Sequence, residues 1–269
     1  MLSVQSKVKG TYMLLTSGIP RLSYVSEGKG PLVIMLHGLL MNGKSWLNNG
    51  FSSFFSPFFH VVCPDLLGHG ISEKAQLQEL YTQQNQAFSI IKIMDELGYE
   101  KAHVIGYSSG AWTALGLLNH YSERLNSVVL GGWDFRNGLP ETSEGKLSFD
   151  MFMSYARSTA PELTSELSLD DQESARCLFN ELRKYSEKKE SLFPYKTPIL
   201  LWAGASDPYY TSMSETAQQY GLSMITGGGD HLSELNHPEK ASINEIFKFI
   251  EYQEVLKPPV VCLSKYQFR

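Results

Sequence analysis

Short apolar runs recur along the chain, and the segments between them carry apolar residues at helical spacing. Residues 32–36 (Leu-Val-Ile-Met-Leu) form a continuous apolar run, which is typical of a central parallel strand covered by helices on both faces. Similar runs predict strands at 58–63, 102–107, 127–130, 199–203 and 222–225. Parallel neighbours need a crossover that a helix supplies. The pattern therefore predicts an α/β fold with a mostly parallel, doubly wound sheet flanked by helices.

The amino-terminal segment predicts a β-hairpin at the edge of this sheet. Strand-like runs at 11–16 and 19–24 are separated by Ser17 and Gly18, which suit a tight turn. With this hairpin included, the expected sheet has about eight strands.

Residues 133–196 interrupt the alternation of strands and helices. They follow the sixth predicted strand and carry a mixed helical pattern. Residues 168–171 (Ser-Leu-Asp-Asp) indicate a helix start, and apolar residues further along give that helix an apolar face. We therefore expect a core domain formed by residues 1–132 and 197–269, with residues 133–196 inserted as a helical cap.

Composition narrows the choice of partners. The 269 residues carry a net charge of −5, which provides no basic surface for nucleic acid. No apolar stretch approaches the length of about 20 residues that a membrane-spanning helix needs. The three cysteines are scattered and odd in number, which fits reduced thiols in the cytoplasm. We expect a cytoplasmic monomer or homodimer that binds a small molecule, with no nucleic-acid partner and no membrane span.

Residues 106–110 (Gly-Tyr-Ser-Ser-Gly) have the pattern Gly-x-Ser-x-Gly. They join the predicted strand 102–107 to the helix-like residues 111–115. A serine on a sharp strand-to-helix turn is held in a strained conformation with its hydroxyl exposed, and glycines on both sides let neighbouring backbone approach. Ser108 is therefore the candidate nucleophile.

A serine hydroxyl needs a base that accepts its proton and an acid that orients the base. Asp207 follows the predicted strand 199–203, and His231 follows the strand 222–225 in a glycine-rich loop. In one hydrolase architecture the acid and the histidine follow the serine in this order. Asp134, which also follows a strand, remains an alternative acid.

The chain resembles the α/β-hydrolase family, in the branch with a cap inserted after the sixth strand. Beyond the serine turn, residues 37–40 (His-Gly-Leu-Leu) match the family's His-Gly segment. Residues 65–70 (Asp-Leu-Leu-Gly-His-Gly) match its Asp-x-x-Gly-x-Gly turn. The resemblance implies the α/β-hydrolase fold for nearly the whole chain.

The resemblance also implies a role for each candidate residue. Ser108 would be the nucleophile, His231 the general base and acid, and Asp207 the orienting carboxylate. The backbone N–H groups of Leu39 and Ser109 would form an oxyanion hole that stabilises the charge on the attacked carbonyl oxygen. No paired-histidine or paired-cysteine motif indicates a metal, and no glycine pattern indicates a phosphate-bearing cofactor, so we expect neither.

This set of residues suits acyl transfer through an acyl-enzyme intermediate. We expect a serine hydrolase that cleaves a carboxylic ester, thioester or lactone of a small to medium, partly apolar substrate. Relatives that hydrolyse carbon–carbon bonds usually carry Gly-x-Gly-Pro-Gly after the first histidine, where this chain has Leu-Leu-Met-Asn at 39–42. A carbon–carbon bond hydrolase and a small-molecule receptor with slow turnover remain alternatives.

Several residues are candidates for contact with the substrate because they flank the expected site or the start of the cap. They are Leu40, Tyr107, Trp133, Phe135, Met151 and Leu232. An equally open interpretation places the aromatic residues among them in the core.

Overall fold

The computed structural model describes residues 3–8, 11–16, 20–143, 145–185 and 195–256. Its main feature is a nine-stranded sheet with the strand order β1-β2-β3-β5-β4-β6-β7-β10-β11. The strands are β1 (Ser3–Val8), β2 (Thr11–Leu15), β3 (Ser23–Glu27), β4 (Leu32–Leu36), β5 (His60–Pro64), β6 (Ala102–Tyr107), β7 (Leu125–Gly131), β10 (Ile199–Gly204) and β11 (Ser223–Gly227). Neighbouring strands are parallel from β5 to β11, whereas β2 and β3 are antiparallel to each neighbour.

The mostly parallel α/β sheet expected from the sequence is confirmed. β2 and β3 pair as a hairpin, although the second strand begins at Ser23 rather than at residue 19. The predicted turn at Ser17 and Gly18 lies outside the described residues. β1 is not indicated by the apolar pattern, because its sequence Ser-Val-Gln-Ser-Lys-Val is mostly polar. With β1 counted, the long interruption follows the seventh strand instead of the sixth.

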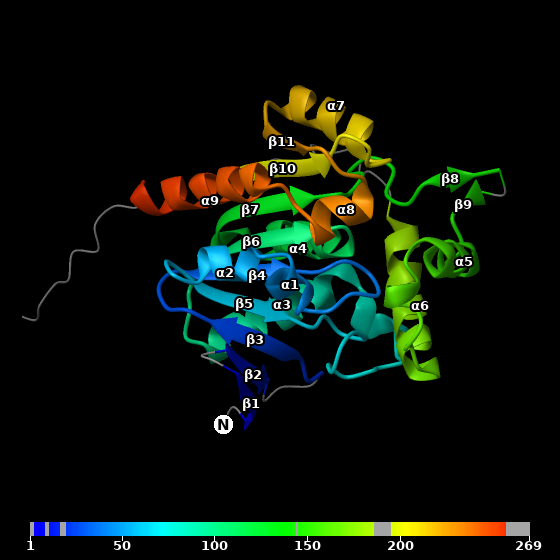
Figure 1. The fold of residues 1–269 in the computed structure, drawn as a ribbon, viewed down its shortest axis with the longest axis horizontal. Helices are drawn as coiled ribbons and strands as arrows, with labels where there is room; N and C mark the ends of the chain where they lie inside the picture. Colours follow the sequence, from blue (N-terminus) through cyan, green and yellow to red (C-terminus); the bar gives the residue numbers. More distant parts are fainter. Residues whose placement is uncertain (1–2, 9–10, 17–19, 144, 186–194, 257–269) are drawn as a thin grey trace, which may run out of the picture.

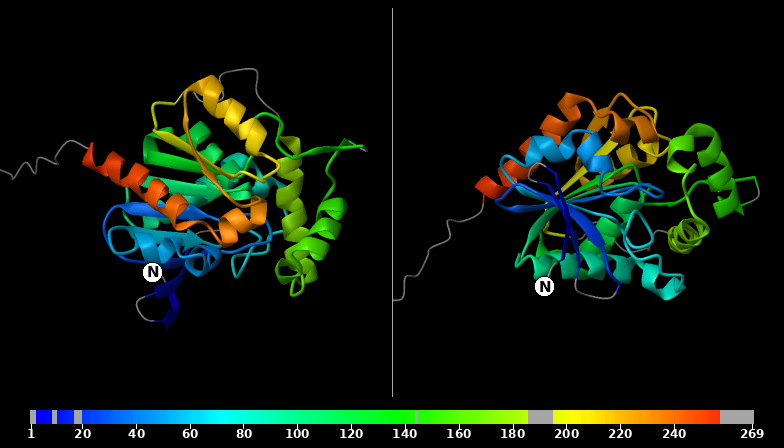
Figure 2. Two further views of the ribbon diagram at one scale, coloured as in Figure 1. Left: turned by 45° about the horizontal axis from the view of Figure 1, so that its top comes forward. Right: turned by 60° about the horizontal axis from the view of Figure 1, so that its bottom comes forward.

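Helices cover both faces of the sheet (Figure 2). In β4, Leu32, Ile34 and Leu36 belong to one buried cluster, and Val33 and Met35 belong to the other, so the strand is apolar on both sides. Side chains of α3 (Gln83–Glu96), α4 (Ser109–Tyr121) and α7 (Tyr210–Tyr220) join the first cluster. Side chains of α1 (Ser45–Asn48), α2 (Phe51–Phe55), α8 (His231–Asn236) and α9 (Lys240–Val255) join the second.

The segment between β7 and β10, residues 133–196, is called the insert below. Its elements are β8 (Glu141–Thr142), β9 (Gly145–Lys146), α5 (Phe149–Thr159), η3 (Pro161–Leu163) and α6 (Leu169–Lys184). Ser168 caps α6 in a capping box with Asp171, as the sequence predicts. In Figure 1 the arrowheads of β7 and β10 point toward the side of the sheet where α6 stands. The insert therefore lies at the carboxyl edge of the sheet.

Two short 3₁₀ helices complete the core outside the insert, η1 (Gln78–Tyr81) and η2 (Ser122–Arg124). Among the described residues, no helix has the length and apolar character needed to cross a membrane.

Candidate active site

Ser108 occupies a sharp turn between β6 and α4. Its φ of 56° and ψ of −121° lie outside the regions that a serine ordinarily adopts. A Cβ atom at Gly106 would lie 2.4 Å from the Gly110 carbonyl oxygen, and a Cβ atom at Gly110 would lie 2.2 Å from the Leu36 carbonyl oxygen. Both positions therefore require glycine, and the close packing that they permit holds Ser108 at the carboxyl end of β6.

His231 lies within hydrogen-bonding distance of both Ser108 and Asp207. The distance from Ser108 Oγ to His231 Nε2 is 3.0 Å, and the distance from His231 Nδ1 to Asp207 Oδ2 is 2.8 Å. Because a carboxylate only accepts hydrogen bonds, the proton on the imidazole belongs at Nδ1, which donates to Asp207. Nε2 then carries a lone pair directed at the Ser108 hydroxyl. The structure thus brings together the three predicted side chains from the ends of β6, β10 and β11.

Asp207 has a fully buried side chain, and both of its oxygens have partners. Oδ1 accepts a hydrogen bond from the Tyr209 N–H at 2.8 Å. Oδ2 accepts from the Tyr107 hydroxyl at 3.3 Å, in addition to His231. Burial, and then the charge of Asp207, raise the pKa of Tyr107 well above its usual range, so this hydroxyl stays protonated and can donate.

Aromatic rings fix the orientation of the imidazole. The Tyr107 and Tyr209 rings both pack against the His231 ring, each with centroids 5.4 Å apart. Tyr107 also packs edge-on against Trp202 of β10 at 4.9 Å. The imidazole therefore has few alternative rotamers while it stays bonded to Asp207.

Asp134, the alternative acid, makes a separate hydrogen-bond network. Its Oδ1 accepts from the Arg136 and Asn137 N–H groups at 2.8 and 3.0 Å and from Ser212 Oγ at 2.7 Å. Its Oδ2 accepts from the Asn137 side-chain amide at 3.0 Å. This carboxylate turns the chain as it leaves β7 and ties it to α7. Geometry favours Asp207 as the acid partner of the histidine.

His231 is the first residue of α8, and Asp230 caps that helix. The Asp230 carboxylate accepts from the Leu232 N–H at 3.1 Å and from the Ser233 N–H at 2.8 Å, with Ser233 completing a capping box. These hydrogen bonds, first of all the one from Ser233, lower the pKa of Asp230. The cap sets the direction in which the chain enters α8 and therefore where the imidazole begins.

Glu234 holds the turn before His231 from within the protein. The residue is buried, its Oε1 accepts from Trp202 Nε1–H at 2.7 Å, and its Oε2 accepts from the Gly229 N–H at 3.1 Å. A Cβ atom at Gly227 would collide with this carboxylate at 1.9 Å. The glycine-rich loop therefore wraps closely around Glu234, a role that the glycines alone do not reveal in the sequence.

The predicted oxyanion donors lie beside Ser108. Ser109 is the first residue of α4, where backbone N–H groups have no acceptor within the helix. Neither its N–H nor that of Leu39 donates to another group among the described residues. Leu40 has a φ of 64°, so the loop turns sharply after Leu39. At Gly38, a Cβ atom would lie 3.4 Å from Ser108 Cβ, which places this loop against the nucleophile.

His37 joins residues 37–41, called the oxyanion loop below after its predicted role, to the turn after β5. Its Nε2 accepts a hydrogen bond from the Leu66 N–H at 2.9 Å, and its Nδ1 lies 2.7 Å from the Gly38 carbonyl oxygen, to which it donates. Burial lowers the pKa of His37 to about 4, so the ring is neutral at pH 7. A neutral ring is what this pairing of one acceptor and one donor nitrogen requires.

With this geometry in place, comparison with known proteins becomes informative. Residues 31–153 match the model of the alpha/beta hydrolase fold family. Over this stretch the chain is similar to α/β hydrolases. It is 33% identical over 135 residues to 2-hydroxy-6-oxo-6-phenylhexa-2,4-dienoate hydrolase of Comamonas testosteroni. That match covers 48% of this chain and 47% of the relative, so the chain spans about half the length of the curated relative that it matches.

Solved structures agree with this α/β-hydrolase fold over most of the chain. The enol-lactonase from Burkholderia xenovorans LB400 aligns with a TM-score of 0.68 and 19% identity, covering 91% of this chain and 99% of that chain. A thermophilic esterase from Thermogutta terrifontis aligns with a TM-score of 0.67 and 18% identity, covering 90% and 98%. At this level of identity the likeness establishes the fold.

A cleft of about 310 Å³ is lined both by residues of the insert and by residues that precede it in the chain. Leu40 and Met41 line it from the oxyanion loop, His69 from the turn after β5, and Glu162 and Glu166 from the insert. A larger hollow of about 630 Å³ is lined by Gln78, Lys146, Asn180, Arg183 and Lys184. None of those residues belongs to the candidate site, whereas Leu40 lines the smaller cleft, which makes the smaller cleft the candidate for substrate binding.

Only Leu40 among the predicted substrate contacts lines this cleft. Trp133 and Phe135 are buried, where they fill the space between the sheet and the insert, and Tyr107 is buried against Asp207. Met151 lies on the exposed face of α5, at 38% exposure. Leu232 follows His231 in α8 and is partly buried. Trp133 and Phe135 pack in the core because they follow β7 directly, where the insert covers the edge of the sheet.

Sequence reasoning missed the contributions of Tyr209, Glu234 and the acidic cleft residues. Tyr209 and Glu234 act through contacts with His231 and Trp202, which local patterns do not indicate. The acidic residues of the cleft depend on where the insert packs against the rest of the chain. Among the described residues, no group of three or more His, Cys, Asp or Glu side chains is arranged to hold a metal ion.

Proposed function

We propose that the protein is a serine hydrolase that cleaves a carboxylic ester, thioester or lactone through an acyl-enzyme intermediate. The observation that carries this proposal is the hydrogen-bonded series of Ser108, His231 and Asp207, with distances of 3.0 and 2.8 Å. The strained turn at Ser108 supports it, as do the adjacent N–H groups of Leu39 and Ser109, which donate to no other group in the described part of the chain.

In the first half-reaction, Ser108 Oγ attacks the substrate's carbonyl carbon while its proton passes to His231 Nε2. The carbonyl electron pair moves to oxygen, and the resulting oxyanion accepts hydrogen bonds from the Leu39 and Ser109 N–H groups. Asp207 stabilises the imidazolium through the proton on Nδ1. The bond to the leaving group then breaks, and the leaving group takes the proton from Nε2.

In the second half-reaction, water attacks the acyl carbon while His231 Nε2 accepts one of its protons. The bond between the acyl carbon and Ser108 Oγ breaks, and Oγ recovers the proton from Nε2. The carboxylic acid departs and the starting state returns. Asp207 and the packed Tyr107 and Tyr209 rings keep the imidazole aligned through both steps.

We also propose that the insert acts as a cap over the site, with residues 1–132 and 197–269 as the hydrolase core. The cleft supports this assignment, because residues of both parts line it. Its volume of about 310 Å³ suits a small to medium substrate.

Hydrolysis of a carbon–carbon bond is a second candidate. It is favoured by the identity of 33% to the Comamonas testosteroni hydrolase, which acts on a phenylhexadienoate. Against it, residues 39–42 lack the glycine-rich sequence that carbon–carbon bond hydrolases usually carry there. Turnover of 2-hydroxy-6-oxo-6-phenylhexa-2,4-dienoate at a higher kcat/KM than any simple ester would favour this candidate.

The proposal is tested by hydrolysis of p-nitrophenyl esters with acyl chains of graded length. We expect turnover by the wild-type protein and a loss of about 10⁴-fold or more in kcat for Ser108→Ala and for His231→Ala. A variant that keeps wild-type turnover without Ser108 would overturn the proposal. Covalent labelling by a fluorophosphonate with negligible ester turnover would instead favour the receptor alternative.

A further inference from the structure

The cleft between core and insert presents hydrogen-bond acceptors and negative charge. Its titratable lining residues are Glu162, Glu166, Asp171 and His69, and no lysine or arginine is among the lining residues. An ionised carboxylate accepts hydrogen bonds and cannot donate them. A ligand in this cleft therefore meets acceptors on the core side and on the insert side.

His69, one of the residues that line the cleft, carries a buried acceptor atom. The residue is 4% exposed, and its Nδ1 lies 3.1 Å from the Leu67 carbonyl oxygen. Because that oxygen only accepts, Nδ1 carries the proton and donates it, which leaves Nε2 with a lone pair. Nε2 has no hydrogen-bond partner among the described residues. Burial, and then the neighbouring His37, lower the pKa of His69 to about 3, so this nitrogen is an acceptor at neutral pH.

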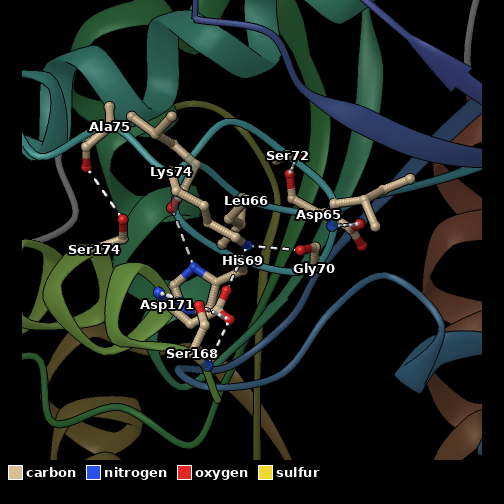
Figure 3. A network of polar contacts seen from close by, with 12 residues as sticks. Asp65, Leu66, His69, Gly70, Ser72, Lys74, Ala75, Ser168, Asp171 and Ser174 are labelled. Carbon is tan, nitrogen blue, oxygen red and sulfur yellow. Dashed lines mark hydrogen bonds and ion pairs between the residues drawn. The ribbon is translucent and has the colours of Figure 1, made fainter. Parts of the chain in front are cut away.

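Two of the carboxylates in the cleft have no cation beside them. Asp171 is paired with Lys74 at 3.0 Å and also caps α6, so its charge is already used in holding the insert to the core (Figure 3). Glu162 and Glu166 are exposed, and neither forms an ion pair within the described parts of the chain. They give the cleft an uncompensated negative charge.

The cleft adjoins the nucleophile through the oxyanion loop. Leu40 and Met41 form part of its wall. Gly38 lies close to both Met41 and Ser108, because a Cβ atom added at Gly38 would lie 3.4 Å from Met41 Sδ and 3.4 Å from Ser108 Cβ. Leu163 and Leu167 of the insert add apolar surface to the same cleft. Ser108 itself does not line the cleft, so a substrate attacked there would reach the cleft past Leu40 and Met41.

We propose that the cleft selects substrates that carry a protonated amine, joined by an apolar spacer to the carbonyl group that Ser108 attacks. This inference rests on the proposed ester hydrolysis and names its substrate class. An ammonium group can donate an N–H hydrogen bond to His69 Nε2. Its positive charge can pair with Glu162 and Glu166, which form no ion pair with the described residues. A carboxylate-bearing substrate meets the like charge of Glu162 and Glu166.

The test compares matched esters in low salt. One series consists of butyrate esters of 4-(aminomethyl)phenol, 4-(hydroxymethyl)phenol and 4-(carboxymethyl)phenol, and a second carries the same three kinds of group on the acyl side of p-nitrophenyl benzoates. In at least one series we expect kcat/KM to be about tenfold higher for the cation than for the anion, with the neutral ester between them. This ratio should shrink toward one in 0.5 M NaCl, because both glutamates are exposed.

Paired substitutions locate the effect. Glu162→Gln combined with Glu166→Gln should lower the cation-to-anion ratio by about fivefold. The matched control, Glu100→Gln combined with Glu123→Gln, makes the same change in net charge at the amino ends of β6 and β7 and should keep the wild-type ratio. An anion that reacts as fast as the cation in both series, or equal ratios in the two double variants, would overturn the inference.

A binding measurement separates this inference from the proposed reaction. In Ser108→Ala protein, calorimetry should show tighter binding of 4-methylbenzylammonium than of 4-methylphenylacetate, and the difference should be lost when both glutamates are replaced. If esters turn over without charge preference, ester hydrolysis stands and the amine inference fails. If no ester turns over but the ammonium binds selectively, the reaction fails and the cleft assignment stands.

Discussion

The His231–Asp207 pair and the polar groups in the cleft under the insert differ in how completely their hydrogen bonds are satisfied. At the carboxyl edge of the sheet, both nitrogens of His231 and both oxygens of Asp207 have hydrogen-bond partners. In the cleft, His69 Nε2 has no partner among the described residues. The hydrogen bonds of the His231–Asp207 pair are complete, whereas the cleft keeps one acceptor without a partner in the described part of the chain.

This difference separates two tasks. A buried carboxylate such as Asp207 is stable only when donors surround it, and the same donors fix the imidazole at the angle that proton transfer needs. A binding surface must keep some hydrogen-bonding capacity free, because a ligand can replace water only by forming the bonds that water formed. Changes in the first region should therefore affect rate, and changes in the second should affect selectivity.

The largest expected effect distinguishes Asp207 from Asp134. Asp207→Asn should lower kcat by about 10³- to 10⁴-fold, because an amide can hold the imidazole in the wrong tautomer and cannot stabilise the imidazolium. Asp134→Asn should leave kcat within about twofold and lower the free energy of unfolding by about 1 kcal/mol through its lost turn hydrogen bonds. Steady-state kinetics and urea denaturation measure both, and a larger rate loss in Asp134→Asn would reverse the assignment.

A second prediction concerns the pH dependence of stability. The folded-state pKa of His37 is about 4, below its usual value of 6.5, so below pH 6.5 the unfolded chain binds a proton that the folded protein does not. The free energy of unfolding should therefore fall by on the order of 3 kcal/mol as the pH drops from about 6.5 toward 4. His37→Gln keeps a donor and an acceptor but cannot titrate.

In that variant the free energy of unfolding should fall less steeply between pH 6.5 and 5, and the difference in slope should correspond to at most one bound proton. His69, whose pKa is also lowered, still contributes to the remaining slope. Urea denaturation at several pH values in this range provides the measurement. Identical slopes in wild type and His37→Gln would show that His37 is not held neutral by burial.

The smallest predicted effect belongs to Tyr107. Tyr107→Phe removes the 3.3 Å hydrogen bond to Asp207 but keeps the ring that packs on His231. We expect kcat to fall about three- to tenfold with KM nearly unchanged, because the loss weakens the alignment of the base and leaves the cleft intact. A rise in KM without loss of kcat would place Tyr107 in substrate binding, as the sequence alone suggests.

The pattern of the sequence predicts the sheet and the order of the candidate triad for a physical reason. Strands such as β4 are apolar on both faces. The glycine at 106 is required by a contact within the serine turn, and the glycine at 110 by the backbone of the neighbouring strand β4. Asp207 and His231 each follow a strand directly, so parallel packing places both at the same edge as Ser108. These features depend on neighbours along the chain or on one layer of the sheet.

Other features depend on long-range packing and escape such reasoning. β1 is mostly polar and is defined by pairing with β2, so no apolar run marks it. Tyr107 turns toward Asp207 because β6 and β10 flank β7 in the sheet, which no local motif encodes. Glu162 and Glu166 line the cleft only because the insert packs beside residues 40–45 and 68–70, which no local pattern predicts.

The most direct test of the central claim is to locate the activated serine. The wild-type protein is treated with a fluorophosphonate, digested and mapped by mass spectrometry, alongside Ser108→Ala and Ser109→Ala. The proposed site predicts one adduct on Ser108, its loss in Ser108→Ala and its retention in Ser109→Ala. An unlabelled wild-type protein, or an adduct that persists in Ser108→Ala, would contradict the assignment of Ser108 as the nucleophile.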